Sequence, residues 1–119
     1  MITSVSEAEI GLYAIATLKP PSPIPFTYKF NLSHFRDPQG QITLRKLTGK
    51  DAEVQAFILA DPRTKAIIHA AEMIAAEKAK WVSMGFYDHH GRWISAGMIE
   101  LIAKQLDAAN YKVAICHQW

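Results

Sequence analysis

The chain has 119 residues, of which half are hydrophobic and a fifth are charged, and its formal net charge at pH 7 is +2. This length supports one core, so we expect a single domain over residues 1–119. The small charge does not by itself favour a nucleic-acid partner, and no apolar run approaches the ~20 residues that a membrane-spanning helix needs.

A single cysteine, Cys116, excludes an internal disulfide and is typical of a reducing compartment. Residues 1–11 lack the basic segment and the apolar core of a signal peptide. We therefore expect a cytoplasmic protein.

The first part of the chain predicts two strands joined by a stiff connector. Residues 10–18 form a short apolar run that favours a buried strand, with a helix starting near Ser6 as the alternative. The prolines of residues 19–23 cannot continue either element. Residues 26–32 alternate as in a strand and lead into a polar segment, residues 33–40, that is closed by turn residues.

Two helices are predicted next. Thr48 and Asp51 have the spacing of a capping box, which places the start of a short helix directly after Thr48. Asp61 and Pro62 fit the N-cap and the first position of a second helix, and apolar spacing carries that helix to about Ala79.

A strand–helix–strand unit ends the chain. Residues 81–86 and 111–116 are apolar runs that predict strands, and the amphipathic stretch 92–109 between them predicts a helix with Asn110 as its left-handed C-cap. Two strands joined by a crossover helix are parallel, so these strands should lie in one sheet, adjacent or nearly so. The predicted fold class is α/β, with a small, mostly parallel sheet flanked by helices.

Polar side chains follow the ends of these strands. Asp88, His89 and His90 come after one strand, and His117 comes after the last. Ligands of open parallel sheets bind at the carboxyl ends of the strands. If the second strand runs in the same direction, Arg36 joins this edge.

Arg92 begins the last helix, where a guanidinium beside free backbone donors binds phosphate or carboxylate in a forked manner. A structural ion pair with Asp88 or Asp37 is the alternative interpretation. Zinc could use Asp88, the histidines and Cys116, but adjacent histidines diverge and no C-x-x-C or H-x-x-x-H framework is present, so we expect no metal and no cofactor.

The three tryptophans receive different interpretations. Trp93 and Trp119 flank the same edge and offer a contact surface to nucleic acid or a protein partner, whereas Trp81 is expected in the core.

Four segments in order carry a family resemblance. Residues 30–32 with Asp37-Pro38 resemble a strand ending in D-V-R that is followed by N-P, and residues 44–51, LRKLTGKD, match L-R-x-L-T-G-x-D. Residues 85–92, GFYDHHGR, fall on G-C-T-G-G-x-H-R, and residues 113–117 fall on a final strand that ends in histidine. In these features the chain resembles the C-terminal domain of the RapZ/YvcJ family, bacterial RNase adapters and metabolite sensors.

The resemblance implies an α/β domain whose G-C-T-G-G-x-H-R loop binds a phosphate-bearing metabolite, in the family an amino-sugar phosphate, and which also takes part in RNA or protein contacts. This chain keeps only Gly85 and Arg92 of that loop, while Asp88 and His89 replace its two glycines. An aspartate at the helix N-terminus caps the helix and competes with an anionic ligand.

We therefore expect a non-enzymatic regulatory or binding domain that takes a phosphorylated small molecule, an RNA or a protein partner at the carboxyl edge of the sheet. The expected ligand-binding residues are Arg92, His89, His90, His117, Arg36 and Asp88. One alternative is a bacterial or bacteriophage interaction module that has lost ligand binding and can form homo-oligomers. A second is a small sugar-phosphate or nucleotide enzyme, with zinc as an optional ion. No membrane partner is expected.

Overall fold

A computed structural model describes residues 8–17, 26–36, 38, 41 and 43–118. Its elements in chain order are β1 (Ile10–Ala16), β2 (Tyr28–Asn31), α1 (Ala52–Leu59), α2 (Arg63–Glu77), β3 (Val82–Asp88), α3 (Ile94–Ala108) and β4 (Val113–Gln118). The proline connector predicted at residues 19–23 and Trp119 lie outside the described residues.

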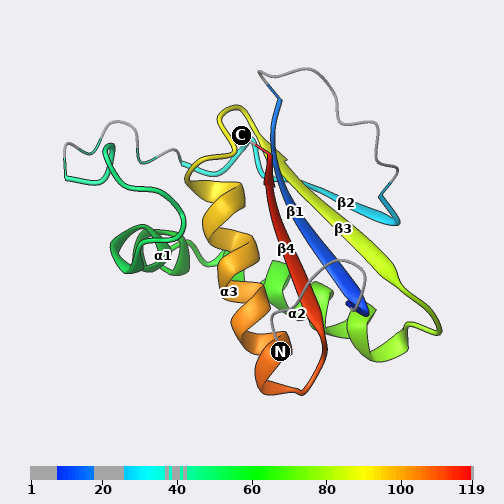
Figure 1. Cartoon of the computed structure of the whole chain (residues 1–119). Helices are drawn as coiled ribbons and strands as arrows, with labels where there is room; N and C mark the ends of the chain where they lie inside the picture. The colour runs from blue at the N-terminus through cyan, green and yellow to red at the C-terminus, as the bar shows by residue number, and fades with distance from the viewer. Residues whose placement is uncertain (1–7, 18–25, 37, 39–40, 42, 119) are drawn as a thin grey trace.

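The described strands form one four-stranded sheet in the order β2-β3-β1-β4, and every pair in it is parallel (Figure 1). This confirms the predicted α/β class. The two strands of the closing unit, β3 and β4, are parallel as expected and lie on either side of β1. In this register Ala16 of β1 is opposite Asp88, and Ala14 is opposite His117.

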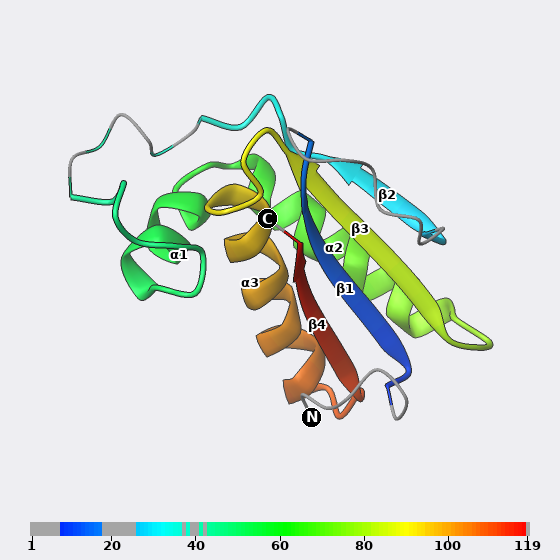
Figure 2. The same ribbon diagram turned by 45° about the horizontal axis from the view of Figure 1, so that its top comes forward.

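The helices α2 and α3 lie on one face of the sheet, and α1 packs beside α3 (Figure 2). The connections from β2 to β3 and from β3 to β4 step across the sheet in the same direction, and right-handed crossovers then place their helices on the same side. Alternate residues of β1 and β3, such as Leu12, Ala14, Met84 and Phe86, are buried beneath them. The central helix is α3, which contacts α1, α2 and three strands.

The other face of the sheet carries aromatic side chains. The Phe26 ring lies over Gly85, where an added Cβ would come within 2.8 Å of the ring, and the Tyr13 ring is 5.1 Å away from it. The prediction of Trp81 as a core residue is wrong, because its side chain is 40% exposed. Strand β3 begins only at Val82, and the Trp81 ring lies beside Gly11, away from the helices.

The predicted start of α1 is also wrong. The carboxylate of Asp51 accepts the N–H of Thr48 at 2.8 Å, as in a capping box. The helix nevertheless begins at Ala52, three residues after the predicted start at Gly49. The N–H of Gly49 donates to the carbonyl oxygen of Arg92 at 2.9 Å. This bond holds the residues after Thr48 in a turn against the loop that precedes α3.

The two other predicted helix boundaries have different outcomes. The helix α2 begins one residue later than predicted, because Pro62 and not Asp61 is its N-cap; the Asp61 carboxylate nevertheless accepts the N–H of Arg63 at 2.9 Å. Asn110 has a φ of 71°, the left-handed conformation expected after α3.

Gly49 and Gly97 bring the loop before α1 directly against α3. A Cβ on Gly49 would overlap the main-chain nitrogen of Gly97, and Gly49 is buried. The side-chain amide of Gln55, also buried, donates to the Gly49 carbonyl at 2.9 Å. A side chain at residue 49 would therefore separate α1 from α3.

Gly49→Ala is expected to lower the free energy of unfolding by about 1–3 kcal/mol, because its methyl group meets main-chain atoms of α3 that cannot rotate away. Gly97→Ala is the matched comparison. Its methyl group meets Cδ1 of Ile58, the movable end of a side chain, and alanine favours a helix over glycine by about 1 kcal/mol. Urea denaturation should show the larger loss for Gly49→Ala, and equal losses would contradict this account of the contact.

Candidate functional site

The loop between β3 and α3 crosses the carboxyl edge of the sheet (Figure 1). Gly91, at its centre, has a φ of +66°, and an added Cβ would lie 2.8 Å from the main-chain nitrogen of Ala16 at the end of β1. The loop therefore turns tightly over β1. It brings Asp88, His89 and Arg92 to one place, the edge at which the sequence predicted a site.

Asp88 holds this loop from inside. Its buried carboxylate accepts the N–H of Gly91 at 3.0 Å and the hydroxyl of Ser95 at 2.5 Å. Asp88 is not the N-cap that the sequence suggested, because α3 begins at Ile94, six residues further on. It instead fastens the loop to the first turn of that helix.

Arg92 connects the loop to the LRKLTGKD segment. Its Nε donates to the carbonyl oxygen of Leu47 and its Nη2 to that of Lys46, both at 3.3 Å, while its guanidinium carbon lies 5.2 Å from the centre of the Trp93 ring. These bonds use two of the five N–H donors of the guanidinium.

The three predicted histidines have different surroundings. His89 is exposed, and His90 is half-buried with its ring edge-to-face against Trp93 at 5.4 Å. His117 lies under the other side of the edge, where its Nε2 is 3.9 Å from a carboxylate oxygen of Glu100 on α3. The loop thus gathers His89 and His90, whereas His117 faces the helix.

The prediction that Trp93 offers an exposed contact surface is wrong. Its side chain is 5% exposed and belongs to the hydrophobic core, because the residue precedes α3 directly and turns beneath it with Ile94. Trp119, the other tryptophan assigned to this edge, is outside the described residues.

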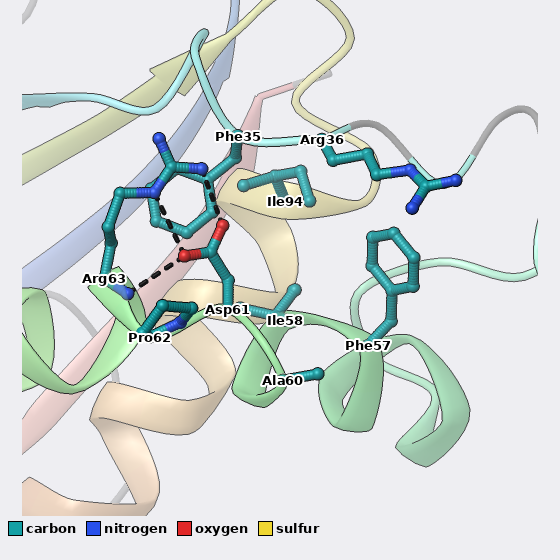
Figure 3. Close-up of a pocket in the computed structure, with 9 residues that line it drawn as sticks. All are labelled: Phe35, Arg36, Phe57, Ile58, Ala60, Asp61, Pro62, Arg63 and Ile94. Carbon is teal, nitrogen blue, oxygen red and sulfur yellow. Dashed lines mark hydrogen bonds and ion pairs between the residues drawn. The ribbon is translucent and has the colours of Figure 1, made fainter.

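Sequence reasoning missed a groove beside this edge (Figure 3). The groove has a volume of about 440 Å³ and lies between the segment after β2, the turn from α1 to α2, and the first residue of α3. Arg36, predicted as a ligand residue, lines it. The only sequence signal was Phe35, an apolar residue within the polar segment 33–40.

An ion pair forms one wall of the groove. Arg63 Nη2 lies 2.6 Å from the Asp61 carboxylate, and the guanidinium stacks on Phe35 with its carbon 4.4 Å from the ring centre. Arg63 also donates to the carbonyl of His34 at 3.3 Å. Hydrogen bonds from Arg63 lower the pKa of Asp61 to about 2.

In the part of the chain that the structure describes, no three His, Cys, Asp or Glu side chains are grouped so that they could hold a metal ion. None of the described helices has the length and apolar character needed to cross a bilayer.

A parallel sheet with helices on one face and a polar loop over its carboxyl edge defines a small α/β domain. The model of one protein family, the RapZ C-terminal domain, matches residues 17–119. The chain therefore belongs to this family, as the sequence resemblance indicated, and it is a regulatory or binding domain. No curated protein matches the chain.

The pKa of Asp61 gives a pH prediction. Because Arg63 lowers this pKa from 3.8 to about 2 in the folded chain, the stabilisation is complete above pH 3.8 and is lost as the pH falls through 2. Asp61→Asn should therefore be less stable than the wild type at pH 7 and equally stable below pH 2. A carboxyl NMR titration should place the Asp61 midpoint near 2, and Arg63→Gln should return it toward 3.8; a wild-type midpoint near 4 would contradict the ion pair.

Proposed function

We propose that this chain is a cytoplasmic regulatory domain that binds a phosphorylated small molecule, of the amino-sugar phosphate kind, at the carboxyl edge of its sheet. The proposed ligand-binding residues are Arg92, His89 and His90 of the loop, with His117 at its side and Asp88 setting the loop geometry. Arg36, which the sequence assigned to the same site, lines the neighbouring groove instead. The observation that carries the proposal is the position of the loop after β3. Because Gly91 has a positive φ and no side chain, the loop lies directly on the end of β1, just before α3 begins.

The charges of the loop support an anionic ligand. Arg92 has three guanidinium N–H donors beyond the two that reach Lys46 and Leu47, and a guanidinium suits the paired oxygens of a phosphate. The exposed imidazole of His89 adds a donor on the same loop. The helix α3, whose N-terminus carries the positive end of its dipole, begins two residues after Arg92.

A small ligand fits these observations better than a macromolecule does. A net charge of +2 over 119 residues does not provide the broad basic surface on which RNA binding depends. A protein interface centres on exposed aromatic anchors, and Trp93, which follows the loop directly, is buried.

Phosphorylated sugars should stabilise the protein against heat. At roughly ten times its Kd, glucosamine 6-phosphate is expected to raise Tm by about 5 °C. His89→Ala should reduce this shift while leaving the ligand-free Tm nearly unchanged, because His89 is exposed. Arg92→Ala should abolish the shift and also lower the ligand-free Tm, because it removes the bonds to Lys46 and Leu47.

His69→Ala, an exposed histidine on α2, is the matched control and should keep the full shift. If neither sugar phosphates nor inorganic phosphate raise Tm, the proposal is wrong. Stabilisation by RNA oligonucleotides alone would assign the loop to RNA instead.

Asp88→Asn separates the effect of the carboxylate charge on ligand binding from the effect of its hydrogen bonds on stability. Removing its negative charge from the loop should tighten phosphate binding by about two- to fivefold. The same change should lower stability by about 1–2 kcal/mol, because Gly91 and Ser95 lose a charged acceptor. Ser95→Ala, the control, should lower stability without tightening binding; calorimetric titration that gives Asp88→Asn a weaker affinity would contradict the assigned role.

A further inference from the structure

The groove beside the edge has apolar walls built from three separate segments. Figure 3 shows Arg36 above Phe57 on one side and Phe35, beside Asp61, on the other. Ile58 and Ile94, both almost fully buried, lie at its base. Its volume of about 440 Å³ is within the range of small-molecule sites.

One wall of the groove is held in place by contacts within the chain. Arg63 covers one face of Phe35 and is itself held by the Asp61 carboxylate and the His34 carbonyl. A site whose wall is already held in place does not spend binding energy on ordering it.

The groove carries one positive charge that the described residues do not neutralise. The charge of Arg63 is balanced by Asp61, and the low pKa of that carboxyl keeps it ionised at neutral pH. Arg36 is exposed and forms no ion pair with any residue that the structure describes. Its side chain lines the groove and extends above Phe57 (Figure 3).

We propose that this groove is a second binding site, separate from the loop after β3, and that its ligand is a flat, apolar organic anion. The planar body would lie between Phe35 and Phe57 over Ile58 and Ile94, and its carboxylate would pair with Arg36.

A sugar phosphate does not fit this groove. Its hydroxyl groups would need hydrogen-bond partners along the body of the groove, where the lining is Phe35, Phe57, Ile58 and Ile94. Asp61 and Arg63 bind one another at its wall, and Arg36 would be engaged by the anionic group. Hydroxyls placed against the phenylalanine and isoleucine side chains would lose their bonds to water without replacement. The two sites therefore differ in ligand chemistry.

Two naphthalene probes of the same shape test the proposal on the full chain. In ¹H–¹⁵N NMR titrations, 2-naphthoate should shift the amides of residues 35–36 and 57–63 in a saturable manner. The neutral 2-naphthalenemethanol should bind at the same place about three- to tenfold more weakly, because it lacks the charge that pairs with Arg36.

Four variants assign the result to the groove. Arg36→Gln should remove the preference for the anion, whereas Arg45→Gln, the same change at another exposed arginine, should keep it. Phe57→Ala should weaken both probes by about threefold or more. His89→Ala should leave naphthoate binding unchanged, which separates this site from the loop after β3.

The proposal is overturned if naphthoate gives no saturable shifts, if it shifts the loop at residues 89–92 in place of the groove, or if Arg36→Gln binds it as tightly as Arg45→Gln does.

Discussion

The structure depends on the contact that locks the segment before α1 to the beginning of α3. The main chain of Arg92 accepts the N–H of Gly49, while its side chain donates to the carbonyls of Lys46 and Leu47. Arg92 thus acts as acceptor and donor toward a single short segment. Because Gly49 has no side chain, its backbone lies directly on Gly97, and α1 is held against α3. In this chain the main structural role of the LRKLTGKD motif is therefore to pack the segment before α1 against the start of α3.

Both candidate sites are built on this junction. The loop after β3 ends at Arg92, and the groove is lined by Ile94 on one side and by the end of α1 on the other. An anion at the loop can use the three N–H donors of Arg92 that do not reach Lys46 and Leu47. Its binding therefore leaves these bonds, and the main-chain bond to Gly49, in place. The two sites share this support but not a ligand.

Local patterns in the sequence predicted the features that depend on neighbouring residues, such as the strands and the end of α3. Short apolar runs predicted three of the strands and alternation predicted β2, and Asn110 takes the left-handed conformation that ends α3. The helix start after Thr48 failed because the N–H of Gly49 bonds to Arg92, which is distant in sequence. Trp81 and Trp93 were assigned the wrong way round because each lies one residue before an element, where its side chain turns in or out according to where the element begins. The groove was missed because no single segment contains enough of its lining to give a pattern.

The loop after β3 keeps its shape by a different means from the glycine-rich loop that it resembles. A glycine-rich loop can turn its N–H groups toward a phosphate because its backbone is unhindered. Here the Asp88 carboxylate holds the N–H of Gly91 and the hydroxyl of Ser95 from the buried side. Asp88 therefore opposes an anionic ligand through its charge and through the donor that it occupies, but it does not fill the outer surface of the loop. On that surface lie Arg92 and the exposed His89, both donors that an anion can use. Anion binding at this loop thus depends more on side chains than on the backbone, and its affinity depends on how far Arg92 and the histidines outweigh one buried carboxylate.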